Sequence, residues 1–272
     1  MDLNLGGKTA LVTGTGSQVG FGRGIALKLA EEGCDVVCAD IDIAGAEKTA
    51  EAVRASGRKA HAVQMDITDR AVVDEAVAAA LREFGHIDIL VNCAGRASGI
   101  RPFTESTQDM WDLDININLR GTMNVTQALL PHMLERGCGK IVNFSTHAAH
   151  QPTGLAGSAV YVAAKSGTVM FSKTLAGEVG YRGININIIA PGPGNTNFHR
   201  VSSSGDTSMM ELVEDLAKAG KTTTPEDIAN TVAFLVSDVS NKLSGQVLEV
   251  SAPAGPGRGQ ENPGTSGQRS AE

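Results

Sequence analysis

Tyr161 and Lys165, four positions apart, form the pair of side chains in this sequence that is best suited to proton transfer. On a helix, this spacing places both side chains on one face. An ammonium group beside a phenol favours the phenolate, so we expect the pKa of Tyr161 to be lowered toward a range useful for acid–base chemistry. Hydroxyl groups that could polarise a substrate oxygen lie upstream, at Ser145, Thr146 and Ser158.

A glycine-rich run follows the first apolar segment of the chain: Thr13-Gly14-Thr-Gly16-Ser-Gln-Val-Gly20-Phe-Gly22-Arg-Gly24. Glycines at such a position let the backbone turn tightly and approach a pyrophosphate, and the N-terminus of the following helix offers free N–H groups to it. An ordinary tight turn is the alternative. Because the run lies between a strand-like and a helical segment, we favour a dinucleotide-binding loop.

Asp40 ends the second apolar segment, at the distance from the glycines where dinucleotide-binding units place a ribose-binding carboxylate. Its carboxylate can accept hydrogen bonds from the adenosine ribose and would repel a 2′-phosphate. The next residues are Ile41 and Asp42 rather than Arg or Lys. We therefore expect NAD rather than NADP, with an ordinary surface aspartate as the alternative.

The elements that would position these residues alternate along the chain. Strand-like apolar runs cover 9–13, 35–40, 59–65, 87–92, 140–144, 184–190 and 246–250. Helical patterns cover 20–32, 43–56, 69–84, 106–136, 155–181 and 225–237, with a break expected at Pro131 and an N-cap at Thr224. This alternation predicts an α/β fold, a Rossmann-type three-layer sandwich with a seven-stranded parallel sheet and ligands at the carboxyl ends of its strands.

Three parts of the chain are expected to differ in organisation. Residues 1–251 are expected to form a single domain, because one large α/β domain fits this length. Within them, the Ser-, Gly- and Thr-rich segment 193–222, with a short helical piece near 209–219, predicts a substrate lid, because long connections are more often functional than passive. Residues 252–272 are rich in Gly, Pro, Ser and Gln, which predicts a flexible tail.

Composition excludes several classes of function. A net charge of -7 and 4% aromatic residues argue against nucleic-acid binding. The sequence shows no secretory signal pattern and no apolar run near the roughly 18 residues of a membrane span. The four cysteines form neither a disulfide framework nor a metal-ligand spacing. We therefore expect a reduced, cytoplasmic protein that acts on a small molecule and holds no metal.

Taken together, these motifs resemble those of the short-chain dehydrogenase/reductase family. The resemblance covers nearly all of residues 5–250 and includes Asp66-Ile67, Asn92-Cys93-Ala94-Gly95, Asn118-Leu119-Arg120-Gly121, Ile141 to Ser145, Pro191-Gly192-Pro193 with Thr196, Thr224 to Ala229, and Ser244 to Val247. It implies an oxidoreductase that transfers a hydride between NAD and a secondary alcohol/ketone pair. Members of this family commonly form tetramers, so it also implies a homotetramer.

The resemblance implies a role for individual residues. Tyr161 would be the general acid or base, Lys165 would bind the nicotinamide ribose and lower the pKa of Tyr161, and Asn118 would hold a water of the proton relay. Asp66 and Ile67 would hold the adenine. The full set of implied cofactor-binding residues is Gly14, Ser17, Gln18, Val19, Gly20, Phe21, Asp40, Ile41, Asp66, Ile67, Asn92, Ala94, Gly95, Tyr161, Lys165, Pro191, Gly194 and Thr196.

Two features depart from the family pattern. The usual loop is Thr-Gly-x-x-x-Gly-x-Gly, whereas the interval from Gly14 to Gly20 is two residues longer. The catalytic hydroxyl is usually the second serine of a Ser-Ser pair, and here Thr146 takes that position on the strand. Ser145 has the opposite pleat parity, so we favour Thr146, with Ser145 and then Ser158 as alternatives.

The substrate is weakly encoded. Basic residues in the loops expected at the strand ends suggest a cationic rim for a carboxylate, sulfonate or acyl-CoA substrate: Arg96, Arg101, His147, His150, His199 and Arg200. An ordinary solvated surface is an equally good interpretation. Two other functions stay open, namely a catalytically impaired subunit with a structural or regulatory role, and an epimerase or dehydratase on the same fold.

Overall fold

The structure, a computed structural model, describes residues 2–150, 157–194, 196, 214–218 and 220–251. Within these ranges, parallel strands form one seven-stranded sheet in the order β3-β2-β1-β4-β5-β6-β7, which confirms the predicted fold class. The strands are β1 (Thr9–Thr13), β2 (Asp35–Asp40), β3 (Ala60–Gln64), β4 (Ile89–Asn92), β5 (Gly139–Phe144), β6 (Ile184–Pro191) and β7 (Val247–Val250). The strand order reverses between β1 and β4, which is the switch point where such sheets bind ligands.

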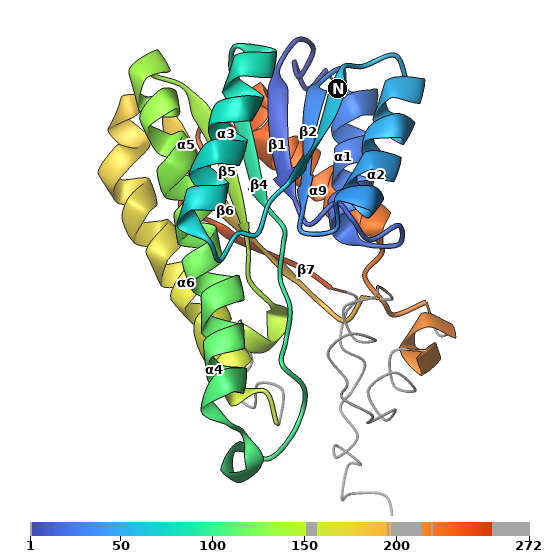
Figure 1. Cartoon of the computed structure of the whole chain (residues 1–272), viewed down its shortest axis with the longest axis vertical. Coiled ribbons are helices and arrows are strands. Elements are labelled where there is room, and N and C mark those ends of the chain that lie inside the picture. Colours follow the sequence, from blue (N-terminus) through green and yellow to red (C-terminus); the bar gives the residue numbers. More distant parts are fainter. Residues whose placement is uncertain (1, 151–156, 195, 197–213, 219, 252–272) are drawn as a thin grey trace, which may run out of the picture.

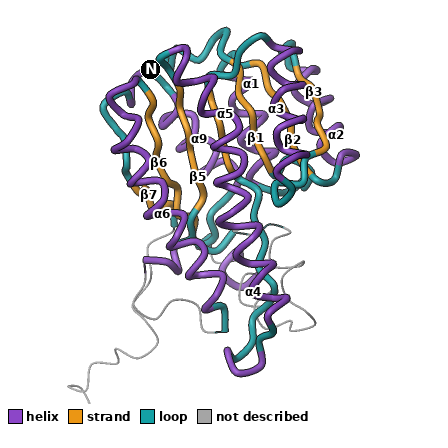
Figure 2. Tube along the Cα trace, turned by 60° about the vertical axis from the view of Figure 1, so that its left-hand side comes forward, coloured by secondary structure: helices purple, strands orange, loops and turns teal. Residues whose placement is uncertain are grey.

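Helices cover both faces of the sheet, as Figure 1 and Figure 2 show. One face carries α1 (Phe21–Glu31), α2 (Ile43–Ala55) and α9 (Pro225–Val236), and the other carries α3 (Arg70–Phe84), α5 (Thr122–Arg136) and α6 (Ala159–Val179). Strand side chains alternate between the two cores, so Ala10 and Val12 of β1 belong to the first and Leu11 to the second. In the described ranges, no helix is both long and apolar enough to cross a membrane.

The helical column predicted over 106–136 is interrupted, but at a different place from the one expected. It consists of α4 (Gln108–Ile115), a π-helical turn (Asn116–Gly121) and α5, which continues through Pro131. Pro131 and Gln127 are both exposed, so the proline, which cannot donate to the Gln127 carbonyl, lies on the solvent side of the helix. The predicted break at Pro131 is therefore wrong.

The helix predicted over 155–181 begins later than expected, at Ala159. Gly157 has φ +83°, and a Cβ there would lie 2.8 Å from Ile100 Cγ2 and 2.9 Å from the Arg101 nitrogen. The left-handed backbone and the close approach of the loop around Ile100 and Arg101 both prevent α6 from extending through this position.

The two ends of the predicted lid, residues 193–222, are held together by backbone contacts. Gly194 and Thr223 form an isolated parallel bridge, and the Thr223 nitrogen donates to the Pro193 carbonyl at 2.8 Å. The Thr223 hydroxyl donates to the carbonyl of Val250 at 2.9 Å, which ties the base to β7. Residues 214–218 are helical. Most of the remaining lid, at 195, 197–213 and 219, and the predicted tail at 252–272 lie outside the described residues.

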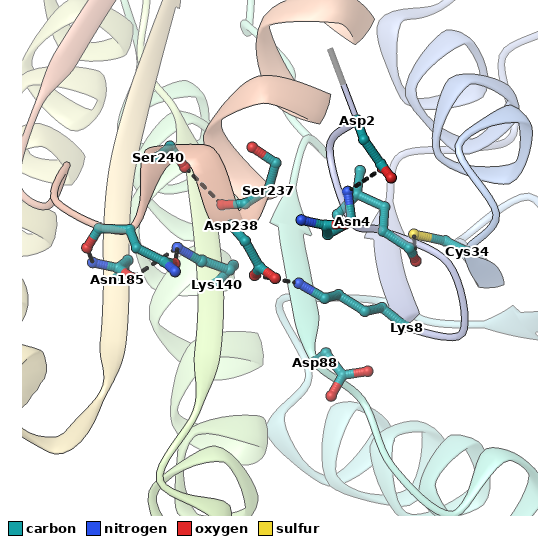
Figure 3. Close-up of polar contacts among 12 residues, drawn as sticks. Asp2, Asn4, Lys8, Cys34, Asp88, Lys140, Asn185, Ser237, Asp238 and Ser240 are labelled. Atoms are coloured by element: carbon teal, nitrogen blue, oxygen red, sulfur yellow. Dashed lines mark hydrogen bonds and ion pairs between the residues drawn. The ribbon is translucent and has the colours of Figure 1, made fainter.

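A polar cluster closes the amino edge of the sheet (Figure 3). Lys140, near the start of β5, is 8% exposed and donates from Nζ to Oδ1 of Asn185 at 2.8 Å and of Asn241 at 2.6 Å. Lys8 pairs with Asp238 at 2.7 Å. Burial lowers the pKa of Lys140 to about 8.

Candidate active site

The first turns of α6 bring Tyr161 and Lys165 to the carboxyl edge of the sheet, where they are 7% and 4% exposed. Lys165 Nζ donates to the carbonyl of Phe144, the last residue of β5, at 3.0 Å. Burial lowers the pKa of Lys165 to about 8. Burial also raises the pKa of Tyr161 above its ordinary value, because a buried phenolate loses its hydration, and a hydrogen bond from Thr146 offsets part of this rise. The expectation that the pKa of Tyr161 is lowered is therefore wrong, and the contribution of Lys165 to that pKa stays a prediction.

Strand parity separates the two candidate hydroxyls after β5. Thr146 is hydrogen-bonded to the Tyr161 side chain, which places it in the site. The Ser145 hydroxyl points the other way and donates to the Lys165 carbonyl at 3.2 Å, in the buried contact with α6. Ser158 is buried at the N-cap position of α6. Of the three hydroxyls, Thr146 is thus the one placed to assist Tyr161.

Asn118 lies in the π-helical turn and is fully buried. Its Nδ2 donates to the Arg96 carbonyl at 2.6 Å and to the Asp114 carbonyl at 2.9 Å, and its Oδ1 accepts from the Arg96 nitrogen at 3.3 Å. A Cβ on Gly95 would lie 3.1 Å from Asn118 Oδ1 and 3.3 Å from Lys165 Nζ. Gly95 therefore keeps the space between the asparagine and the lysine open, and π-helical turns are frequent at functional sites.

The glycine loop packs against the end of β4 in a way that side chains would prevent. Gly14 has φ +78°, and a Cβ there would lie 2.9 Å from the Ala94 Cα and nitrogen. A Cβ on Gly22 would lie 2.1 Å from the Gly14 carbonyl oxygen. Gly20 is the N-cap of α1 and has no side chain to satisfy the first-turn N–H groups, so these are available to an anion.

Asp40 stands beside this loop, at the end of β2. Its Oδ2 accepts from the Gly16 nitrogen at 2.7 Å, and its Oδ1 accepts from the Asp42 nitrogen at 2.9 Å. These two bonds fix the plane of the carboxylate. Ile41, the next residue, is a large apolar side chain that is 63% exposed.

The comparisons with known proteins agree with this geometry. A family model described as enoyl-(acyl carrier protein) reductase matches residues 14–252. A relative from Thauera aromatica, described as (2S)-[(R)-hydroxy(phenyl)methyl]succinyl-CoA dehydrogenase subunit BbsD, is 39% identical over 245 residues, which are 89% of this chain and 94% of that protein. The chain belongs to the short-chain dehydrogenase/reductase family.

Other members of this oxidoreductase family are similarly close. A 3-oxoacyl-[acyl-carrier-protein] reductase FabG from Staphylococcus aureus is 38% identical, over 89% of this chain and 96% of that protein. A 3-ketoacyl-(acyl-carrier-protein) reductase from Brucella melitensis, solved with NADH, has a TM-score of 0.82 and 34% identity, and covers 91% of this chain and 98% of its own. NAD+-bound xylitol dehydrogenase has a TM-score of 0.83 and 27% identity, with 92% of this chain and 100% of its own covered.

The extra residues of the loop in this short-chain dehydrogenase/reductase tie it to α2. Gln18 Nε2 donates to the carbonyls of Gly16 and Gly45, at 3.0 Å in each case. The neighbouring Val19 is exposed. The Ser17 hydroxyl is buried and has no hydrogen-bond partner among the described residues. The longer loop thus exposes an apolar side chain and buries an unpaired hydroxyl beside the start of α1.

Residues expected at the two ends of the cofactor lie on opposite sides of the switch point. Asp66 Oδ1 accepts from the Thr68 nitrogen and hydroxyl, at 2.9 and 2.7 Å, and Ile67 packs so closely on Gly121 that a Cβ there would lie 2.5 Å from Ile67 Cδ1. At the other end, a Cβ on Gly194 would lie 2.6 Å from Phe21 Cζ. Pro191, which ends β6, and Thr196, whose nitrogen donates to the Gly194 carbonyl at 2.9 Å, complete that side.

Asn92 differs from the other expected cofactor residues, because its side chain lies in the interior. Its Nδ2 donates to the Thr126 hydroxyl at 3.0 Å and to Asn143 Oδ1 at 2.8 Å, between the sheet and the helices. Its Oδ1 is buried without a hydrogen-bond partner in the described part of the chain. The side chain of Asn92 therefore has an internal role at the end of β4, and its contact with the cofactor stays a prediction.

Asp114 is a buried carboxylate near the site that the sequence motifs did not reveal. Its oxygens accept from the Ser98 nitrogen at 2.7 Å and from the Ser98 hydroxyl at 2.9 Å. Burial raises the pKa of Asp114, and its charge in turn contributes to the raised pKa of Tyr161. Asp114 lines a cavity whose walls also include Arg101, Trp111 and Ser158. Asp114 stands one helical turn before Asn118, but Asp109 and Asp112 precede it in the same segment, so the sequence does not single it out.

The cationic rim expected around the substrate is partly neutralised. Arg96 is exposed at the end of β4, as expected. His147 Nδ1, in contrast, lies 2.9 Å from Glu249 Oε2 on β7, so a protonated His147 would already have a carboxylate partner. Two further residues of the expected rim lie outside the described residues: His199 and Arg200.

Proposed function

We propose that this protein is an NAD-dependent oxidoreductase that transfers a hydride between NAD and a secondary alcohol/ketone pair. The observation that carries the proposal is the hydrogen bond between Thr146 and Tyr161, with Lys165 one turn further along α6. These three groups stand at the carboxyl edge of the sheet, beside the end of β5, and the glycine loop follows β1 on the same edge. NAD supplies the hydride donor or acceptor when bound, and the protein's residues handle the proton.

Each side chain of the site has a different role in proton transfer. Tyr161 holds a proton at Oη, and its raised pKa keeps it a phenol at neutral pH, which suits it to give that proton to a ketone oxygen. Thr146 helps to polarise that oxygen. Lys165 and Asn118, separated only by the space above Gly95, connect the site to the proton supply. In the reverse reaction the same Oη takes the proton of the alcohol.

Several observations fit a nicotinamide dinucleotide. The free N–H groups at the start of α1, the close-packed Gly14 and the unpaired Ser17 hydroxyl suit a pyrophosphate. The oriented Asp40 carboxylate suits the unphosphorylated ribose of NAD, and the exposed Ile41 suits an adenine face. The related structures with NADH and NAD+ support the same choice.

For the substrate, we propose a ketone carried on an acyl thioester. The relatives whose names mention succinyl-CoA and an acyl carrier protein support this class. The contact of His147 with Glu249 occupies one of the basic side chains that a free carboxylate would need, which favours the thioester over the free acid. The working form is a cytoplasmic homotetramer, in keeping with the family's habit and with the four free cysteines.

Tyr161→Phe tests the proposed function. We expect it to abolish reduction of a β-ketoacyl-CoA, followed by NADH absorbance, while NADH binding followed by fluorescence stays measurable. The chain offers a matched control, Tyr181→Phe, because Tyr181 is the other of its two tyrosines and is 83% exposed. NADPH and the free β-keto acid are run alongside.

Full turnover by Tyr161→Phe would defeat the assignment. Preference for NADPH, or for the free acid over the thioester, would overturn the cofactor or the substrate part alone. A wild-type protein that binds neither NADH nor NADPH would instead favour a structural or regulatory subunit.

A further inference from the structure

A chain of buried polar side chains crosses the otherwise apolar contact between the sheet and α6. Asn92 Nδ2 donates to Asn143 Oδ1, and Asn143 Nδ2 donates to the Ser172 hydroxyl, both at 2.8 Å. Ser172 then donates to the carbonyl of Thr168 at 2.6 Å. All four residues are at most 3% exposed. The donors all point the same way, from the carboxyl end of β4 toward the middle of α6.

Thr168 carries this chain on to the π-helical turn. Its hydroxyl lies 2.9 Å from the Asn118 carbonyl and 3.2 Å from the Ala164 carbonyl in its own helix. A hydroxyl has one proton, so the shorter bond to Asn118 is the one that it makes. The Thr122 hydroxyl adds a longer contact to the same carbonyl, at 3.3 Å.

The position of Thr168 links two elements that must stay in register. Thr168 lies three residues after Lys165 on α6, so both side chains are on neighbouring parts of one helix face. Asn118 belongs to a separate helical column, and a π-helical turn leaves carbonyls without their regular partners. The Thr168 hydroxyl therefore fixes the turn that carries Asn118 against the helix that carries Lys165.

We propose that Thr168 is a positioning residue that sets the distance between Lys165 and Asn118. This inference rests on the proposed oxidoreductase function, in which these two groups deliver the proton to Tyr161. A buried polar network is costly when one partner is missing, so an apolar residue at position 168 would remove the shorter of the two side-chain hydrogen bonds to the Asn118 carbonyl and leave the Thr122 contact. The turn would then relax, and the proton path across Gly95 would lengthen.

Thr168→Val tests this, because valine keeps the shape of threonine and removes only the hydroxyl. We expect kcat for ketone reduction to fall about tenfold, the scale of a small displacement of catalytic groups, while KM for NADH stays within about twofold. The solvent deuterium isotope effect on kcat should increase, since proton delivery becomes slower. Thr168→Ser, which restores the hydroxyl, should recover most of kcat.

Thr126→Val is the matched control. Thr126 is equally buried and accepts from Asn92 at the opposite end of the same network, away from Lys165. We expect it to lower the urea midpoint of unfolding as much as Thr168→Val does, with kcat and the isotope effect unchanged. A merely structural role for Thr168 would make the two variants alike.

The inference is overturned if Thr168→Val keeps the wild-type kcat, if Thr126→Val lowers kcat equally, or if Thr168→Ser recovers nothing. Failure of the proposed function looks different, because Tyr161→Phe would then retain turnover. Loss of turnover in Tyr161→Phe together with wild-type behaviour of Thr168→Val would reject only the positioning role.

Discussion

Two buried lysines stand at opposite ends of β5. Lys140 lies near its start, in the polar cluster of Figure 3, and Lys165 reaches the carbonyl of Phe144 at its end. Burial lowers the pKa of each to about 8, because an ammonium group loses hydration in both places. Judged by pKa alone, the two ends of the strand are equivalent.

The surroundings of the two ammonium groups are different. Lys140 is held by two side-chain amide oxygens, in a cluster that joins β5, β6 and the turn after α9. Lys165 donates to a backbone carbonyl and also borders the space that Gly95 keeps open beside Asn118. A shifted pKa therefore marks burial, and an adjacent opening with further polar groups is what marks a site of chemistry.

Replacing each lysine by methionine gives the largest expected contrast. Lys165→Met should lower kcat/KM for ketone reduction by about 10³-fold, because the site loses its cation and its route for protons. Lys140→Met should stay within about twofold of the wild type, since its edge of the sheet faces away from the ligand site. Steady-state kinetics with NADH measure both. Comparable losses in the two variants would show that the amino edge takes part in the reaction.

The hydroxyls of Thr146 and Ser145, which follow β5, allow a second comparison between a group in the site and a group with a structural role. Thr146→Ala should lower kcat by about 10²-fold, because it removes a donor placed at the developing charge. Ser145→Ala should have a much smaller effect, since its hydroxyl serves the Lys165 carbonyl inside the contact with α6. A larger loss in Ser145→Ala than in Thr146→Ala would reverse the assignment.

The smallest expected effect concerns stability, and it tests the structural nature of Lys140. Its pKa is about 8 in the folded chain and 10.5 ordinarily, so the unfolded chain binds more protons between these values. The free energy of unfolding of the wild type should therefore rise relative to that of Lys140→Met as the pH increases from 8 to 10.5, and the difference should be constant below pH 8. Urea unfolding of both proteins at several pH values measures this difference in the free energy of unfolding. A difference that stays flat or falls above pH 8 would show that burial does not lower the pKa of Lys140.

Local patterns in the sequence were sufficient for much of the fold and the site. The seven strands followed from apolar runs of the right length, because both faces of the sheet are covered. The spacing of Tyr161 and Lys165 and the parity of Thr146 are also local properties, and the structure brings these residues together.

The remaining features depend on contacts between distant parts of the chain. The sequence around Pro131 suggested a break, yet α5 continues through this exposed proline, and the irregularity falls at Asn118 instead. The direction of the Tyr161 pKa shift depends on burial, which the spacing of Tyr161 and Lys165 does not reveal. Thr168 meets Asn118 across 50 positions of sequence, so nothing in its own segment indicates its partner.

The closed base of the predicted lid has a consequence for how this fold can change. The bridge between Gly194 and Thr223 brings the two ends of the segment together, and Thr223 fixes them to β7. The entropy of closing such a loop grows slowly, by about 0.6 kcal/mol for each doubling of its length. A change in the length of the segment between these two residues should therefore cost little free energy of unfolding, so that the segment can vary separately from the scaffold that carries Tyr161 and Lys165.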